Sequence, residues 1–305
     1  MPNFNEVLGE IVQAQQSGDN ASFDTIRRKY INELSKHTGR NVICYYSAWL
    51  SAPAGTPNLS IDDMDKNGLM NAVSSMDCTK GLDLLLHTPG GSITAAESLV
   101  FYLKQKFGRD IRAIIPQMAM SAGTMIACAC KEIFMGHQSS IGPFDPHVRG
   151  ASAFSVFDEF RRATQDIQKF PHTLPLWQSL LQKYPLGFLE DCDRAIQLAR
   201  QLVPQWLRDG MLSDFSDAEK NQKIESVMAA LNNPNETKEH SRHIHHTKAR
   251  DIGLVVRLLE DDQLLQDRVL SVHHAYMSTL LSTRTAKIIE NNNQQAFMLT
   301  WGANQ

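Results

Sequence analysis

Two short turns of the sequence contain residues that could do covalent chemistry. The first, 89–91, reads Pro-Gly-Gly, and the second, 120–124, reads Met-Ser-Ala-Gly-Thr with Ser121 in second place. Each turn follows a short apolar run of the kind that forms a strand buried on both faces. In open α/β sheets, ligands bind outside the carboxyl ends of such strands, so both turns are expected at that edge.

Together the two turns supply two of the three parts needed for covalent acyl transfer. Ser121 at the start of a helix could expose its Oγ as a nucleophile. The N–H groups of Gly90 and Gly91, with a helix N-terminus behind them, suit a developing oxyanion, and the N–H groups beside Ser121 could serve the same oxygen. Each turn alone also has a structural interpretation, because Pro-Gly-Gly often only makes a turn and a serine often only caps a helix.

Longer segments around both turns resemble a known family. Residues 82–99 (LDLLLHTPGGSITAAESL) and 118–146 (MAMSAGTMIACACKEIFMGHQSSIGPFDP) look like the Clp-protease/crotonase superfamily and, within it, like the signal peptide peptidase A group of serine peptidases. Further segments resemble the branch called serine dehydrogenase proteinases: 183–199, 241–256 and 269–280. The resemblance covers roughly residues 40–290, and this set of motifs is fairly specific.

The resemblance implies a fold, a site and an assembly. It implies Ser121 as the nucleophile and an oxyanion hole from the amides of Gly91 and Ala122, next to Gly90. It implies an α/β fold of the Clp/crotonase type, a repeated β-β-α spiral, to which we expect added helical segments at the N-terminus and at about 153–230. It also implies a homo-oligomer, since such folds often complete their sites by assembling.

The general base is harder to assign. Clp-like relatives place a histidine after the serine unit, where His147 comes close, but the acid partner would fall near Ser241, which is not acidic. Signal peptide peptidase A relatives instead use a lysine further along the chain, and a lysine must be buried to accept a proton near neutral pH. Lys169, which lies 48 residues after Ser121, is our predicted base, with Lys183 and His147 as alternatives.

A histidine-rich segment follows in the second half of the chain. Four histidines stand there: His240, His243, His245 and His246. Histidine-rich tracts can bind metals, but this one lacks the glutamate of H-E-x-x-H. We interpret the segment as a surface turn or a subunit contact, and we predict no metal and no cofactor.

The first half of the sequence alternates helices and strands. We expect two helices within 4–36, a loop at 51–60, and a helix from Ser60 to about 76 that starts with a capping-box-like pattern. Apolar runs predict strands at 42–46, 82–86, 111–115 and 133–135. Helices at 93–107 and after Ser121 separate the later strands, which indicates parallel pairing with right-handed crossovers.

The second half has a different character. Residues 136–152 are expected to be mostly loop, 153–230 only helices, and 232–235 a loop. We then expect a core strand at 253–256, a long helix from Gln263 to about Glu290, and a terminal strand at 296–301. These elements predict four units of one integrated domain: 1–40, 41–152, 153–235 and 236–305.

Composition limits the function classes. The chain has 305 residues, 42% hydrophobic and 21% charged, with a net charge of −3, which is typical of a globular protein and gives no reason to expect nucleic acid as a partner. Five scattered cysteines do not form a disulfide framework, so we expect reduced thiols and a cytoplasmic location. The start of the sequence lacks the pattern of a secretory signal. The uncharged run 113–130 is short and interrupted by Pro116, so we predict a buried strand and helix rather than an integral membrane segment.

The leading hypothesis is a serine peptidase acting on peptides or unfolded proteins through an acyl-enzyme on Ser121. One alternative is a scaffold that kept the fold and lost the base. Another is a crotonase-type enzyme acting on coenzyme-A thioesters, although the helix after Ser121 offers no glutamate before Glu132. An α/β-hydrolase is disfavoured because Ser121 does not lie in G-x-S-x-G.

Overall fold

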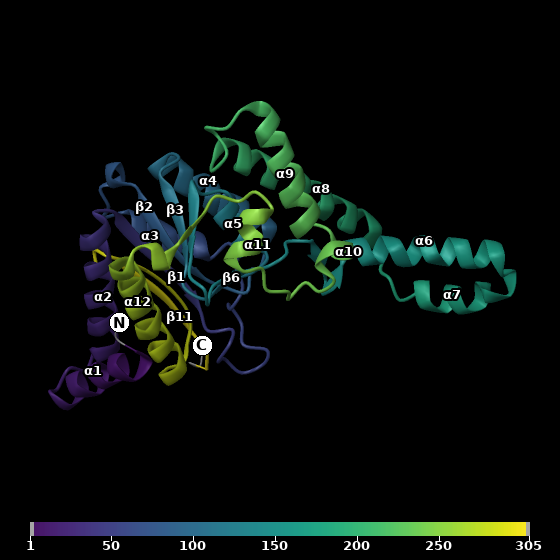
Figure 1. Cartoon of the computed structure of the whole chain (residues 1–305). Coiled ribbons are helices and arrows are strands. Elements are labelled where there is room, and N and C mark those ends of the chain that lie inside the picture. Colours follow the sequence, from purple (N-terminus) through teal and green to yellow (C-terminus); the bar gives the residue numbers. More distant parts are fainter. Residues whose placement is uncertain (1–2, 303–305) are drawn as a thin grey trace.

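A seven-stranded sheet forms the centre of the molecule in the computed structural model, which describes residues 3–302 (Figure 1). Its spatial order is β11-β10-β1-β2-β3-β5-β9. The strands are β1 Asn41–Ser47, β2 Leu82–His87, β3 Ile111–Ile115, β5 Glu132–Met135, β9 Val256–Leu258, β10 Thr285–Asn291 and β11 Ala296–Thr300. The five strands from β1 to β9 are parallel, and β10 and β11 add an antiparallel hairpin at one side. The ends of the first and last predicted units, 1–2 and 303–305, lie outside the described residues.

Helices cover both faces of this sheet. The helices of the described residues are α1 Phe4–Gln16, α2 Ser22–Thr38, α3 Asp65–Val73, α4 Ile93–Phe107, α5 Ala122–Cys128, α6 Ala153–Lys169, α7 Leu174–Leu181, α8 Phe188–Asp209, α9 Asp217–Leu231, α10 Pro234–Thr237, α11 His246–Asp251 and α12 Gln263–Ser282. One apolar cluster packs α1, α2 and α12 against one face, and a larger cluster packs α3, α4, α5, α8 and α9 against the other. The two clusters give three layers, and β1 and β2 are buried along their whole length because both of their faces are covered.

Short strands outside the main sheet complete the β-β-α arrangement. Strand β4 (Met118–Ala119) follows β3, β6 (Ser140–Ile141) follows β5, and the two pair in parallel. Single bridges extend this second layer from Ile61 to Gly91 and from Thr88 to Ala119. The predicted Clp/crotonase-like α/β fold is therefore confirmed, with the second turn leading from β4 directly into α5.

The segment after residue 146 extends away from the sheet. A small hairpin of β7 (His147–Val148) and β8 (Ala151–Ser152) leads into α6. Figure 1 shows α6 and α7 as a teal arm projecting from the body. The base of this arm has an apolar cluster of its own, formed by α6 and the first half of α8: Ala153, Val156, Phe188, Cys192 and Ile196. The predicted run of helices from 153 to 230 is confirmed.

The prediction of one helix from Gln263 to about Glu290 is wrong. Helix α12 ends at Ser282, and β10 then pairs antiparallel with β1. The sequence pattern did not indicate a strand at 285–291 because two charged residues of β10, Lys287 and Glu290, are fully buried. Lys287 Nζ lies 2.6 Å from Asp65 Oδ1, and Glu290 pairs with Arg27 over 2.9 Å, so partners far away in sequence compensate both charges.

Three smaller predictions also need correction. The helix expected from Ser60 to about 76 is α3, which has no side-chain cap and occupies only Asp65–Val73. The carbonyl of Ser60 instead accepts a hydrogen bond from Lys287 Nζ over 2.7 Å. The expected loop 232–235 includes the start of α10, and the strand expected at 253–256 begins only at Val256.

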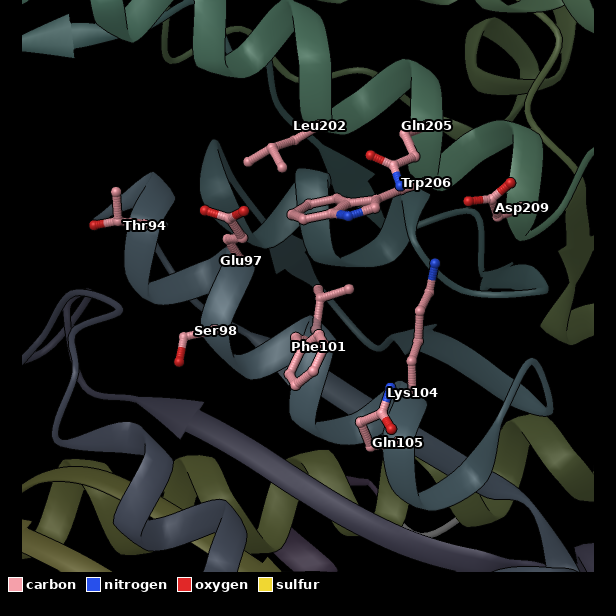
Figure 2. Close-up of a pocket in the computed structure, with 11 residues that line it drawn as sticks. Thr94, Glu97, Ser98, Phe101, Lys104, Gln105, Leu202, Gln205, Trp206 and Asp209 are labelled. Carbon is pink, nitrogen blue, oxygen red and sulfur yellow. The ribbon is translucent and has the colours of Figure 1, made fainter.

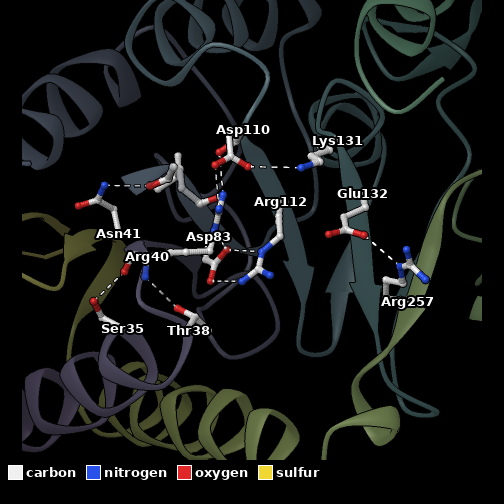
Figure 3. Close-up of polar contacts among 12 residues, drawn as sticks. Ser35, Thr38, Arg40, Asn41, Asp83, Asp110, Arg112, Lys131, Glu132 and Arg257 are labelled. Carbon is white, nitrogen blue, oxygen red and sulfur yellow. Dashed lines mark hydrogen bonds and ion pairs between the residues drawn. The ribbon is translucent and has the colours of Figure 1, made fainter. Parts of the chain in front are cut away.

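Buried ion pairs tie the strands together at the amino-terminal edge of the sheet, opposite the two turns. Figure 3 shows the carboxylate of Asp83 on β2 between the guanidinium groups of Arg40 and Arg112. Asp83 is fully buried, and it accepts from Arg40 Nε over 2.9 Å and from Arg112 Nε over 2.6 Å. The same edge includes an exposed pair between Arg257 and Glu132.

The uncharged run 113–130 becomes most of β3, then β4 and α5, as predicted. Among residues 3–302, no helix combines the length and apolarity that crossing a membrane requires.

Candidate active site

The two turns lie directly against each other. Thr88 N–H donates to the carbonyl of Met118 over 3.1 Å, and Met120 N–H donates to the carbonyl of Thr88 over 3.0 Å. A Cβ added to Gly90 would lie 2.6 Å from the Cβ of Ser121. Glycine is therefore required at position 90 for the first turn to approach the serine so closely.

The backbone of Ser121 adopts an uncommon conformation. Its φ is 50° and its ψ is −118°, and residues other than glycine rarely adopt a positive φ. Such a conformation costs on the order of 1–3 kcal/mol and is concentrated at functional sites. The tertiary structure holds Ser121 in this conformation at the junction of β4 and α5.

The side chain of Ser121 does not cap the helix that it precedes. Ser92, which occupies the same place after the first turn, does cap its helix, because its Oγ accepts from Ala95 N–H over 3.2 Å. The structural interpretation therefore holds for Ser92 and fails for Ser121, whose Oγ has no hydrogen-bond partner within residues 3–302.

The backbone N–H groups around Ser121 divide into two pairs. Gly90 N–H donates to Thr88 Oγ1 over 3.1 Å, and Gly123 N–H donates to a carbonyl of its own turn over 2.8 Å. Within the described part of the chain, the N–H groups of Gly91 and Ala122 have no acceptor. These two amides are therefore available to donate to a substrate oxygen.

A segment from another part of the chain fixes the position of Gly91. Ile61 N–H donates to the carbonyl of Gly90 over 2.7 Å, and Ser92 N–H donates to the carbonyl of Ile61 over 2.9 Å. The buried ammonium group of Lys287 holds this same segment through the carbonyl of Ser60. Lys287 thus supports the first turn from β10, a role that the sequence pattern did not indicate.

A cavity of about 330 Å³ opens beside Ser121. Its lining residues come from both turns, from α4 and α5, from β7 and the loop before it, and from α8: Gly91, Ser92, Ile93, Thr94, Ser121, Met125, Phe144, Pro146, His147, Arg194, Ala195 and Leu198. Half of these side chains are apolar. Helix α8 belongs to the helical segment expected at 153–230, and it forms one wall of this cavity.

His147 is the histidine in the wall of this cavity, and a buried carboxylate supports it. Its Nε2 lies 3.4 Å from Oδ2 of Asp145, and the other oxygen of Asp145 lies 2.8 Å from Nδ1 of His240. Burial alone would raise the pKa of the Asp145 carboxyl, but the contacts with His147 and His240 outweigh it and hold that pKa well below its ordinary value. Asp145 therefore stays ionised between the two rings.

The two predicted lysines lie elsewhere. Lys169 is the last residue of α6 on the arm, exposed, with its Nζ 5.2 Å from the ring centre of Phe170. Lys183 is exposed in the connection between α7 and α8. Neither lysine lines the Ser121 cavity, whereas His147, the third candidate, does. Spacing alone did not reveal Asp145, although the run Asp-Pro-His at 145–147 was a signal that could have suggested the pair.

Comparison with known proteins agrees with this geometry. Residues 18–183, more than half of the chain, match the family described as ClpP-like SDH-type serine proteinase. The chain belongs to this family of ClpP-like serine proteinases. The serine dehydrogenase proteinase branch inferred from the motifs is thereby confirmed.

Two curated relatives of this ClpP-like serine proteinase come from Methanocaldococcus jannaschii. The uncharacterized protein MJ1495 is 29% identical over 146 residues, which are 46% of this chain and 49% of that protein. The uncharacterized protein MJ0137 is 36% identical over 134 residues, 43% of this chain and 46% of that protein. The chain thus spans about half the length of the curated relatives that it matches.

A second cavity of this ClpP-like proteinase lies between α4 and α8. Figure 2 shows Phe101 and Lys104 on α4 opposite Trp206 and Asp209 on α8. The cavity measures about 450 Å³, and burial lowers the pKa of Lys104 there. Neither Ser121 nor the glycines of the first turn line it, and Thr94 is the one lining residue that it shares with the Ser121 cavity.

The histidine-rich segment of this serine proteinase lies against β6 and the segment between β5 and β6. His243 Nδ1 lies 2.8 Å from Ser140 Oγ, and His245 Nδ1 lies 3.1 Å from the carbonyl of Ser139. The segment is a partly exposed turn, and His240 differs from its neighbours because it reaches the buried Asp145.

Proposed function

We propose that this protein is a serine peptidase that cleaves peptide bonds through an acyl-enzyme on Ser121. One observation carries the proposal: the free Oγ of Ser121 lies beside two backbone N–H groups, of Gly91 and Ala122, that have no acceptor within residues 3–302. A nucleophile next to N–H groups that can receive the oxyanion is the arrangement that acyl transfer requires.

In the proposed reaction, Ser121 Oγ attacks the carbonyl carbon of the scissile bond and its proton passes to the general base. The amides of Gly91 and Ala122 stabilise the resulting oxyanion. The tetrahedral intermediate then collapses, the C–N bond breaks, and the base returns the proton to the leaving amine. Water then attacks the acyl-enzyme ester in the same way, and its hydrolysis releases the acid product and regenerates Ser121.

We propose His147 as the general base, oriented by Asp145, in preference to Lys169 and Lys183. His147 lines the same cavity as Ser121, while both lysines are exposed outside it. The carboxylate of Asp145 faces Nε2 of His147, so it would stabilise the imidazolium formed during attack and leave Nδ1 to take the serine proton. Hydrogen bonds of this kind often tighten only when substrate binds.

The cavity also suggests the substrate. Its side walls include Met125, Phe144 and Leu198, which favour an apolar side chain next to the scissile bond. Helix α8 narrows the approach, so we propose extended peptides and unfolded proteins as substrates. Assembly into a homo-oligomer and a cytoplasmic location remain part of this proposal.

The test compares four variants of the full chain on fluorogenic peptides and on labelling by a fluorophosphonate. We expect Ser121→Ala to abolish labelling and turnover, and His147→Gln to lower kcat about ten-thousand-fold. Lys169→Gln and Lys183→Gln serve as matched controls and should keep the full rate.

Two results would contradict the proposal at different points. If Lys169→Gln abolishes turnover and His147→Gln does not, the assignment of the base is wrong. If the unaltered protein neither labels at Ser121 nor cleaves any peptide, the protein is the catalytically degenerate scaffold considered above.

A further inference from the structure

Three side chains from two distant segments meet at one point beside the candidate site. Asp145, His147 and His240 each offer one ligand atom, and these atoms all lie within 4.8 Å of one another. The two imidazole rings are only 4.0 Å apart, centre to centre, and face the two oxygens of the same carboxylate. This grouping is not explained by the serine chemistry alone, because that chemistry has no need of His240.

Backbone pairing builds the cluster. Ile141 and Ile244 form an antiparallel bridge, with N–H to carbonyl distances of 3.0 and 2.8 Å in the two directions. Asp145 follows Ile141 by four residues and His240 precedes Ile244 by four, so antiparallel pairing carries the two residues toward each other. The β7–β8 hairpin then brings His147 to the same carboxylate.

We propose that Asp145, His147 and His240 form a binding site for Zn²⁺. Two imidazole nitrogens and one carboxylate oxygen are a ligand set that zinc commonly takes, with a fourth position left for water. Tetrahedral zinc at its usual bond lengths separates neighbouring ligand atoms by about 3.3 Å. The distances of 2.8 and 3.4 Å from Asp145 to the two rings already bracket this separation.

Burial and charge favour a cation at this point. Asp145 is only 2% exposed, while the two rings are about a quarter to a third exposed and leave a path from solvent. The ionised carboxylate supplies the negative charge, and each neutral imidazole can keep its single proton on the nitrogen that faces away from the metal. Magnesium, which prefers oxygen ligands, should bind poorly here.

Zinc at this site would also control the peptidase, a consequence that rests on the proposed function. His147 bound to zinc, with its other nitrogen protonated, has no lone pair to accept the proton of Ser121. Zinc would therefore inhibit turnover reversibly, and a chelator such as EDTA would restore it.

The experiment measures zinc binding separately from activity. Zinc sulfate is titrated into the full-length Ser121→Ala variant by calorimetry and in competition with a chromogenic chelator. We expect one Zn²⁺ per chain, with affinity lowered about a hundredfold or more when His240→Gln or Asp145→Asn is added. His243→Gln is the matched control from the same segment and should leave the affinity unchanged, and magnesium should not compete.

Some results would overturn the zinc site. If His240→Gln leaves the zinc affinity unchanged, the proposed site is wrong. It is also wrong if His243→Gln lowers the zinc affinity as much as His240→Gln does, because the histidine-rich segment would then bind zinc without Asp145. Circular dichroism of each variant confirms that it is folded, and His240→Gln keeps the test decisive if Asp145→Asn unfolds. Tight zinc binding that leaves peptide turnover unchanged would instead reject His147 as the base while the zinc site stands.

Discussion

At the scale of single residues, the backbone of Ser121 carries the most specific information about this protein. A positive φ with a side chain costs free energy that a simple helix start would not need. The first turn is constrained as well, because a side chain on Gly90 would collide with Ser121 and a side chain on Gly91 would collide with Ile61. Two predictions follow from backbone geometry at these positions.

Replacing Ser121 by glycine should stabilise the protein while abolishing turnover. Glycine adopts a positive φ without steric cost, so the folded state loses its strain. The Ser121→Ala variant also lacks Oγ but keeps the strain. We therefore expect the free energy of unfolding of Ser121→Gly to be about 1 kcal/mol higher than that of Ser121→Ala. Urea unfolding monitored by circular dichroism measures the difference, and equal stability of the two variants would mean that no strain is stored at this residue.

Replacing Gly91 by alanine should damage the site far more than a comparable change elsewhere. The added Cβ would come within 2.9 Å of Ile61 Cα and would collide with other backbone atoms of that residue, so the first turn must move. Loss of one oxyanion donor typically lowers kcat about a hundredfold or more. Gly108→Ala is the control, because Gly108 also has a positive φ but has open space around it. Comparable kcat values for the two variants would argue against Gly91 as an oxyanion donor.

At the scale of elements, the two ends of the parallel strands have different roles. The carboxyl ends carry the two turns, while the amino ends carry the ion pairs of Asp83 with Arg40 and Arg112. Parallel strands need their relative positions fixed, because a shift of β2 against β3 would separate Gly90 from Ser121. The buried carboxylate of Asp83 on β2 binds Arg112 on β3 and Arg40 just before β1, so it links the three strands at their amino ends.

Replacing Asp83 by asparagine should therefore lower the free energy of unfolding by about 3 kcal/mol, since two guanidinium groups would lose their buried carboxylate. The exposed pair of Arg109 and Asp214, 3.3 Å apart, provides the control, and Asp214→Asn should have no measurable effect. Equal stability of the Asp83→Asn variant and the unaltered protein in urea would show that the ion pairs do not hold the sheet.

At the scale of the whole molecule, two apolar layers on either side of the sheet stabilise the body, and the arm of α6 and α7 lies outside both. The layer under α12 also buries two histidines. His87 lies within 5.4 Å of the Tyr46 ring and 4.3 Å of the Trp49 ring, centre to centre, and His273 Nδ1 lies 3.3 Å from the hydroxyl of Tyr46. Both rings are neutral in the folded protein.

Because His87 and His273 are buried in the neutral form, we expect the free energy of unfolding to decrease in mild acid. Burial lowers the pKa of His273 from 6.5 to about 3 and lowers that of His87 well below 6.5. Below pH 6.5 the unfolded chain takes up protons that the folded chain does not, so the folded state loses up to about 1.4 kcal/mol per pH unit for each histidine. This loss continues until the pH reaches the folded pKa, about 3 for His273.

The measurement is urea unfolding at a series of pH values from neutral to mildly acidic. His273→Gln should flatten the decrease in stability, and His172→Gln, an exposed histidine on the arm, should leave it unchanged. An unchanged slope in His273→Gln would show that His273 does not titrate as its burial requires.

Local patterns in the sequence were sufficient to predict the elements and the chemical groups that depend on neighbouring residues. Alternating apolar strands and helices predicted a parallel α/β core, and the turns 89–91 and 120–124 indicated the nucleophile and the amides, because turns and strands are encoded by neighbouring residues. Local patterns failed at β10, where buried Lys287 and Glu290 are compensated by residues more than two hundred positions away.

Packing between distant segments determines which N–H groups are free and which titratable groups line the Ser121 cavity. Gly90 and Gly91 are adjacent in sequence, yet one amide is taken by Thr88 Oγ1 and the other is not. Lys169 has the spacing of a base, yet α6 carries it out along the arm. His240 reaches Asp145 through the pairing of Ile141 with Ile244, two residues 103 positions apart. Hydrogen-bond partners and cavity walls are properties of packing between distant segments, and spacing along one chain does not contain them.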